Sequence, residues 1–308
     1  MEENEYTYWI AIAHLPRWTQ EKINNLVIKI IHDEKITLSD FFECDDVILR
    51  DRFNLTDKEI SDINDVKIKL PNLAFLTERL LNKGYKIIPI NSELYPKTMK
   101  KNLKVKYSPT IIYTKGDVKI LQEDSVAIVG SRDANEDALK FTDNISKKMS
   151  NEYKVVVSGF AKGVDRQSLD SSIKYNGNSI IVLPQGILTF DSGFRKYYSQ
   201  INNGGVIVLS TFPPEAGWST GLAMARNRYI YGLAKEIYVA QTSNSGGTWA
   251  GATDGLKKGR KVFIYYPNND KHSPAYELIK LGAKPIDYNG NLLNIDIPQG
   301  TQQLTLFL

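Results

Sequence analysis

The chain has 308 residues, of which 42% are hydrophobic and 24% are charged, the proportions of a soluble globular protein with one large or two ordinary domains. No apolar run approaches ~20 residues, so a membrane-spanning helix is excluded, and the acidic first residues lack the pattern of a signal peptide. A single cysteine, Cys44, excludes an internal disulfide and predicts a protein of the reducing cytoplasm.

The net charge of +4 is unevenly distributed along the chain. Residues 1–80 contain 10 basic and 16 acidic residues, whereas residues 81–308 contain 29 and 19. The second part therefore suits a polyanionic partner, although a well-solvated lysine-rich surface explains the same charge. The three histidines, His14, His32 and His272, are dispersed, so no metal site is expected.

Residues 1–83 are predicted to form a separate small all-α domain. Thr19 is a candidate N-cap. One apolar helix face follows it, formed by Ile23, Leu26, Val27, Ile30 and Ile31. Further short helices are expected near 37–43, 46–52, 57–64 and 72–83. Glycine is absent from these 83 residues, which suits a compact helical bundle.

From residue 84 to residue 286 the sequence predicts a second domain of α/β class, followed by an extended tail at 287–308. Strands are expected at 86–90, 110–114, 125–129, 154–158, 179–183, 205–210, 236–241 and 261–266. Helices are expected at about 135–150, 165–176, 192–202, 226–234, 248–258 and 274–281. Strand runs such as SIIVL are apolar throughout, which is typical of parallel strands buried on both faces, so we expect a doubly wound, mostly parallel sheet.

A glycine-bearing turn follows the strand VAIV. Gly130 lets the chain turn and a ligand approach the backbone, Ser131 offers a hydroxyl, and Arg132 can clamp a phosphate. Arg132 and Asn135 stand where a dinucleotide fingerprint needs its second and third glycines, so a nicotinamide dehydrogenase is not expected. For this loop alone, the alternative is a tight turn with an exposed arginine.

A second turn follows the strand VVVS. Its candidate contact residues are Ser158, Gly159, Phe160, Lys162 and Gly163. The two glycines leave a bare backbone arch, and the lysine supplies charge at its rim. We expect Asp165 to cap the next helix rather than to contact a ligand, because a catalytic acid needs a partner and no second carboxylate is near in sequence.

Two further segments are predicted to join these turns. Arg226, Asn227 and Arg228 stand before a helix expected to begin near Tyr229, and they suit phosphate or base-edge contacts; the alternative is a pair of surface arginines that brace loops. The other segment is a predicted anion nest at a helix start, formed by Ser245, Gly246, Gly247 and Thr248.

The carboxyl ends of parallel strands meet at one sheet edge, where α/β proteins bind ligands, so the four segments together predict an anion site. No Walker sequence, Ser-His-Asp set or metal-ligand set accompanies them. We therefore expect the site to hold an anion without transforming it, with no catalytic residue, no cofactor and no metal.

The residues above occur in blocks that resemble, in order and spacing, the DprA/Smf family of DNA-processing proteins. The blocks are VAIVGSR, VVSGFAKGVD, GNSIIVLPQGI, RNRYIYGLA, NSGGTWAGATDGLKKGRKVF and YELIKLGAKPI, and the similarity covers roughly residues 8–286. The resemblance implies a Rossmann-like domain after a sterile-alpha-motif-like domain, a dimer, and no established enzymatic chemistry. It also implies binding of single-stranded DNA without sequence preference and loading of the RecA recombinase in natural transformation and homologous recombination.

The resemblance also implies roles for individual residues. Phosphates would be gripped by Arg132, Lys162, Arg226 and Arg228. The DNA strand would approach the protein backbone closely at five glycines: Gly130, Gly159, Gly163, Gly246 and Gly247. Aromatic neighbours would stack bases, with core packing as the alternative for each of Phe160, Tyr229 and Trp249.

Three departures from the family pattern keep other functions open. Gln167 and Ser168 stand where the family has a histidine, the nest reads SGGTWAGA instead of SGSLITA, and no winged-helix domain is expected. A mobile-element or defence-associated homologue is one alternative, and an interaction scaffold is another. A third is a non-catalytic small-nucleotide sensor related to the lysine-decarboxylase-like LOG group, whose glutamate is missing after Gly246-Gly247-Thr248.

The last residues carry one further candidate. The peptide Gln303, Leu304, Thr305, Leu306 and Phe307 resembles the QLxLF peptide that docks bacterial sliding clamps. An extended peptide of this kind buries its apolar side chains in a groove of the partner. The alternative is a terminal strand that packs Leu306 and Phe307 on its own domain.

Overall fold

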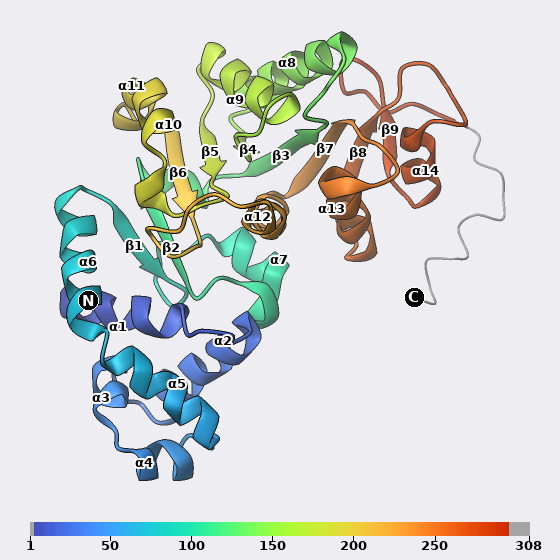
Figure 1. Ribbon diagram of the computed structural model, residues 1–308. Coiled ribbons are helices and arrows are strands. Elements are labelled where there is room, and N and C mark those ends of the chain that lie inside the picture. Colours follow the sequence, from blue (N-terminus) through green and yellow to red (C-terminus); the bar gives the residue numbers. More distant parts are fainter. Residues whose placement is uncertain (1–2, 296–308) are drawn as a thin grey trace.

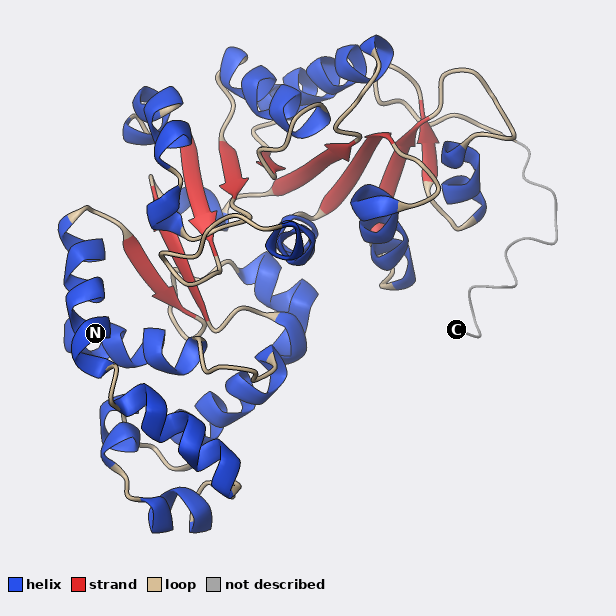
Figure 2. Ribbon diagram, viewed as in Figure 1, coloured by secondary structure: helices blue, strands red, loops and turns tan. Residues whose placement is uncertain are grey.

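The computed structural model describes residues 3–295. Its fold is the predicted α/β class: a nine-stranded, mostly parallel sheet, preceded by a helical region (Figure 1). Helices cover both faces of the sheet (Figure 2). The candidate clamp-binding peptide, 303–307, lies outside the described residues.

The helical region occupies residues 3–82, at the lower left of Figure 1. Its α-helices are α1 (Glu3–Ala13), α2 (Gln20–Ile28), α3 (Leu38–Glu43), α4 (Asp46–Asp51), α5 (Asp57–Lys67) and α6 (Leu70–Asn82). Thr19 is the N-cap of α2, as predicted, since its side chain accepts a hydrogen bond from the Lys22 N–H. The first helix, α1, was not expected from the sequence.

One hydrophobic core joins this helical region to the sheet. Trp9 of α1 and Phe41 of α3 belong to the same buried cluster as Tyr113 and Val208, which lie on strands of the sheet. Outside the core, Arg79 pairs with Glu215 at 2.6 Å. The division into two domains at residue 83 stays a prediction, because the core is continuous across it.

The strands lie side by side in the order β1-β2-β6-β5-β4-β3-β7-β8-β9. They are β1 (Lys86–Pro89), β2 (Ile111–Lys115), β3 (Ser125–Gly130), β4 (Val155–Ser158), β5 (Ser179–Val182), β6 (Val206–Ser210), β7 (Glu236–Gln241), β8 (Lys261–Tyr265) and β9 (Lys284–Ile286). β2 pairs antiparallel with both β1 and β6, and every other pair is parallel. All the expected strands are present, and β9 is additional.

The helices of this part are α7 (Lys97–Tyr107), α8 (Glu136–Asn151), α9 (Val164–Lys174), α10 (Asp191–Lys196), α11 (Tyr198–Asn202), α12 (Thr220–Leu233), α13 (Gly246–Lys257) and α14 (Pro274–Lys280). The prediction that a helix begins near Tyr229 is wrong. α12 begins at Thr220, where the Ser219 side chain accepts a hydrogen bond from the Leu222 N–H, so Arg226 and Arg228 lie inside a helix.

The strand order places a topological switch at β3. From β3 the chain builds outward through β4, β5 and β6, then returns to add β7 on the other side of β3. At such a point the loops that leave neighbouring strands diverge to opposite faces and open a crevice. No helix in residues 3–295 is long and apolar enough to cross a membrane.

Candidate functional site

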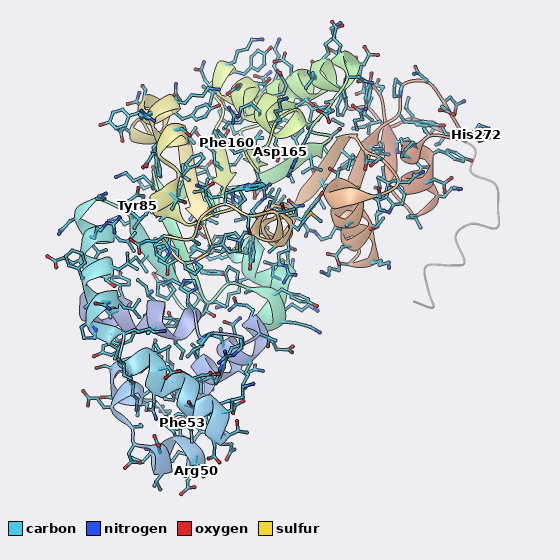
Figure 3. All side chains as sticks on the ribbon, in the orientation of Figure 1. Arg50, Phe53, Tyr85, Phe160, Asp165 and His272 are labelled. Carbon is cyan, nitrogen blue, oxygen red and sulfur yellow. The ribbon has the colours of Figure 1, made fainter. Side chains whose placement is uncertain are left out.

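The loops after β3, β4 and β7 meet at the switch point and, together with α12, line an open cavity of about 380 Å³. Figure 3 labels Phe160, in the loop after β4, and Asp165, at the start of α9, above α12 in this view. The structure thus brings residues of all four predicted segments together. Those that line the cavity are Gly130, Ser131, Arg132, Asp165, Arg226, Asn227, Ser245, Gly246, Gly247 and Thr248.

The loop after β3 is hydrogen-bonded to the end of β7 and to the start of α9, which follows the loop after β4. The Ser131 N–H donates to the Gln241 carbonyl oxygen at 3.0 Å, and the Ser131 carbonyl oxygen accepts from the Val164 N–H at 3.2 Å. Gly163 has φ +76°, and a Cβ there would lie 2.6 Å from the Arg132 carbonyl oxygen. Gly163 is therefore required for this close approach, which leaves the Arg132 side chain exposed beside the cavity.

The loop after β7 closes the other side of the cavity. Gly246 has φ +86° and begins α13, and the Thr248 hydroxyl donates to the Gly130 carbonyl oxygen at 3.1 Å. A Cβ at Gly247 would lie 2.5 Å from the Asn227 side-chain nitrogen. The helix start at Gly246 and this amide therefore face the same space, where N–H groups and the positive end of the helix dipole favour an anion.

Two predicted contact residues, Arg226 and Ser158, are buried rather than exposed, and of these only Arg226 lines the cavity. Arg226 is only 3% exposed, and its Nη1 donates to the carbonyl oxygens of Gly159 and Val182, the latter at 3.0 Å. The Ser158 hydroxyl is fully buried and donates to the Asp165 carbonyl oxygen at 2.6 Å. The buried Arg226 guanidinium therefore braces the loop from within, whereas the alternative kept from the sequence was a pair of arginines that brace loops at the surface.

Asp165 also holds this loop from within. It is the second residue of α9 rather than its N-cap, and its carboxylate accepts from the N–H groups of Gly159 and Ala161. Burial raises the pKa of Asp165, and the nearby Arg226 charge opposes that rise. Burial likewise lowers the pKa of Arg226, against the pull of Asp165. The two charges therefore stabilise each other in an apolar environment.

Three further predicted contact residues, Phe160, Lys162 and Arg228, do not line the cavity. The Phe160 ring packs edge-on against Phe190, with ring centroids 4.8 Å apart, and the Arg166 guanidinium lies 3.7 Å from its centre. Lys162 is exposed in the same loop but is not among the residues that line the cavity. Arg228 is exposed on α12 and lies 5.1 Å from the ring of Tyr107 on α7.

The structure adds residues that sequence reasoning did not select. Met224 lines the cavity and is 52% exposed, and Trp218 is 58% exposed just before Thr220, another lining residue. A large exposed aromatic beside an anion site is suited to stacking on a base. The signal for Trp218 was its position in the segment PPEAGWS, where a core tryptophan is unusual.

Chemically, the cavity offers one exposed guanidinium, hydroxyls and backbone N–H groups. The carboxylates that line it are Asp133, which is exposed, and Asp165, which is buried and already bonded. No cluster of three or more potential metal ligands occurs in residues 3–295. This set of groups is suited to holding a phosphate-bearing ligand by charge and hydrogen bonding.

Comparison with known proteins gives a consistent result. The family model described as DNA recombination-mediator protein A matches residues 86–295. The DNA processing protein DprA of Bacillus subtilis is 28% identical over 253 residues, 79% of this chain and 81% of that protein. DprA of Streptococcus pneumoniae is 27% identical over 188 residues, 60% of this chain and 66% of that protein.

Solved structures show the same fold. The X-ray structure of DprA from Streptococcus pneumoniae has a TM-score of 0.71 at 22% identity, covering 92% of this chain and 94% of that one. DprA from Helicobacter pylori, whose structure addresses its single-stranded DNA binding mode, has a TM-score of 0.56 at 23% identity. That match covers 65% of this chain and 90% of the other.

Proposed function

Because this chain belongs to the DNA recombination-mediator protein A family, the DprA/Smf proteins, we propose that it binds single-stranded DNA through the cavity at the switch point. The observation that carries the proposal is the convergence of three strand-end loops around exposed Arg132. A DNA strand supplies the repeated phosphates that such loops bind. The relative from Helicobacter pylori, described as binding single-stranded DNA, supports this choice of ligand.

We divide the predicted residues into two groups by their burial. Direct phosphate contact is proposed for Arg132 with Lys162 at the rim, for Ser131 and Asn227, and for the nest residues Ser245, Gly246, Gly247 and Thr248. Support of the loops from beneath is proposed for Ser158, Gly159, Asp165 and Arg226, whose side chains or backbone are buried. Phe160 belongs with the supporting group, because its ring packs among other aromatic side chains.

Base contacts in this site are non-specific in our proposal. The exposed Trp218 and Met224 offer apolar surface that accepts any base. We also propose that the protein acts as a binding mediator rather than an enzyme, since Asp165, the buried carboxylate, is committed to the loop.

The cellular role follows from family membership as a further proposal. In it the chain acts in the cytoplasm as a homodimer, protects incoming single-stranded DNA, and loads a RecA-type recombinase during recombination or transformation. A sliding clamp is an additional proposed partner through residues 303–307. The separation into a helical domain at 1–83, a Rossmann-like domain at 84–286 and a tail is likewise proposed.

A small-nucleotide sensor is the second candidate, and the size of the cavity favours it. A volume of about 380 Å³ lies within the range of small-ligand pockets, roughly 300–1,000 Å³. A sensor would be stabilised by mononucleotides as strongly as by oligonucleotides, because a ligand shifts stability according to its affinity for the folded state.

Two measurements separate these functions. A mobility-shift titration of single-stranded against double-stranded oligonucleotides at two salt concentrations should show tighter binding of the single strand, weakening steeply with salt. A thermal-shift comparison of nucleotides with oligonucleotides should show stabilisation by oligonucleotides alone. The sensor function would be assigned instead if a mononucleotide raised the melting temperature and no oligonucleotide showed salt-dependent binding in the mobility-shift titration.

A further inference from the structure

A second and larger cavity lies at the opposite edge of the sheet. It has a volume of about 890 Å³ and is lined by residues at the amino ends of β3, β7 and β8, by the end of α13 and by the second half of α7. In Figure 1, α7 lies beneath α12, beside the lower end of α13. No residue of the four predicted segments lines this cavity.

The lining of this second cavity is strongly basic. Eight lysine and arginine residues and only two acidic residues, Asp124 and Glu236, contribute to it. Both acids are already paired: Lys235 pairs with Asp124, and two other lysines contact Glu236 at 3.5 and 3.6 Å. A surplus of positive charge in one concave site raises the local concentration of anions.

Three lysines of α7 carry that surplus. Lys101, Lys104 and Lys106 are exposed, and none of them makes an ion pair with another residue in 3–295. Lys104 has φ +54° and ψ −172° in the middle of α7, a conformation that is almost restricted to glycine. Strain of this kind persists where the surrounding structure holds it, and here it bends the helix at the cavity.

A third hollow connects the two cavities. It has a volume of about 270 Å³ and shares Asn227 and Gly247 with the first cavity, and Tyr107 and Lys258 with the second. Arg228 also lines it, and both Arg228 and Lys258 lie over the Tyr107 ring, at 5.1 and 5.2 Å from its centre. Two basic side chains, of which Lys258 is paired with Asp254 at 2.7 Å, and an aromatic face thus lie between the two cavities.

We propose that a single DNA strand held by the loops continues between α12 and α13 into the basic cavity, where the lysines of α7 bind its phosphodiester backbone. This inference rests on the proposed function and extends it. It gives Arg228 a position on the path although it points away from the first cavity. It also makes the two edges of the sheet parts of one binding track.

The test compares a short and a long strand on the full chain. β3 has six residues and spans roughly 20 Å, whereas a single strand advances at least about 3.4 Å per nucleotide, so an oligothymidylate of about three nucleotides fills only the first cavity and one of about 20 nucleotides reaches both. The triple variant Lys101→Glu, Lys104→Glu, Lys106→Glu should bind the short strand like the parent. It should bind the long strand about tenfold more weakly. The slope of the logarithm of the binding constant against the logarithm of the salt concentration should be smaller in magnitude by about two.

A charge-matched control uses exposed lysines away from the track, in Lys58→Glu, Lys83→Glu, Lys119→Glu. An equal loss in both triple variants, an equal loss for both strand lengths, or parental binding of the long strand by the α7 variant would each overturn the inference. Failure of the proposed function has a different signature, because the parent itself would then bind neither strand.

A second measurement on the parent chain does not depend on how any variant folds. Acetylation of lysines by a small reagent should be slowed at Lys101, Lys104 and Lys106 by the long strand and not by the short one. Unchanged reactivity of all three with the long strand bound would overturn the inference.

Discussion

Asp165 and Arg226 hold the backbone of Gly159 from its two polar groups: the Gly159 N–H donates to the Asp165 carboxylate, and the Gly159 carbonyl oxygen accepts from Arg226. Both side chains are buried beneath the candidate site. The loop after β4 is therefore fixed by a charged pair from within, which leaves the exposed Arg132 beside the cavity free to contact a ligand.

Replacement of Gly159 should be costly for this reason. A Cβ in Gly159→Ala would lie 2.5 Å from the Asp165 carboxylate and still closer to the Arg226 guanidinium. Overpacking of this kind costs about 1–3 kcal/mol, and urea unfolding should show that loss. Gly217→Ala is the matched control, since a Cβ there meets no atom within 4 Å. Equal stability of the two variants would contradict the packing described.

Arg226 and Asp165 should be energetically coupled. Arg226→Met leaves two carbonyl oxygens without their donor and the buried Asp165 carboxylate without its nearby positive charge, which should cost about 3–5 kcal/mol of unfolding free energy. Adding Asp165→Asn removes the stranded charge, so the double variant should lose less than the sum of the two single losses. Strictly additive losses in denaturant titrations would show that the pair does not act as a unit.

Much of the fold could be predicted, because β-branched apolar runs such as VVVS and SIIVL have few alternatives to a buried parallel strand. The convergence of the loops after β3 and β4 could also be predicted, because the carboxyl ends of parallel strands meet at one edge of the sheet. The position of Arg226 did not, because TGLAMARNR has no clear apolar face and the helix start depends on the Ser219 cap. Burial of Arg226 depends on which strands are neighbours, and local sequence does not encode that.

The basic cavity was also beyond prediction from sequence. Its residues come from α7, β3, β7, β8 and the turn after α13, which are more than 150 residues apart at the extremes, and only the strand order brings them together. The charge surplus after residue 80 was visible in the sequence, but its concentration in one hollow was not.

The pH dependence of stability should reflect His14. Its Nε2 lies 2.9 Å from the hydroxyl of the fully buried Tyr113, and burial lowers the pKa of His14 from 6.5 to about 4. The unfolded chain then binds more protons between these values, so the free energy of unfolding should fall as the pH decreases from 6.5 to 4. The expected slope is at most about 1.4 kcal/mol per pH unit.

Unfolding titrations at several pH values check this expectation. In His14→Phe the slope between pH 6.5 and 5 should shrink, whereas in His32→Gln, which changes an exposed histidine, it should persist. An unchanged slope in the first variant would assign the pH dependence to other groups.

The backbone of α7 offers a stability test that is independent of DNA. Lysine at φ +54° costs on the order of 1–3 kcal/mol, a cost that glycine avoids, so Lys104→Gly should be neutral or stabilising by up to about 1 kcal/mol. Lys101→Gly, in the regular part of the helix, should lose about 1 kcal/mol. In thermal unfolding, the melting temperature of Lys104→Gly should equal or exceed that of the parent, whereas the melting temperature of Lys101→Gly should fall below it. Equal destabilisation would mean that the bend at Lys104 is not strained.

The central claim is that the loops around Arg132 bind a single DNA strand. It is tested most directly by fluorescence-anisotropy titration of the parent, of Arg132→Glu with Lys162→Glu, and of a charge-matched control, Lys58→Glu with Arg195→Glu, whose side chains are exposed elsewhere. We expect salt-dependent binding by the parent and the control, and a loss of at least about 100-fold in the loop variant, since reversing two phosphate contacts turns attraction into repulsion. Binding of the loop variant with the affinity of the parent would contradict the claim.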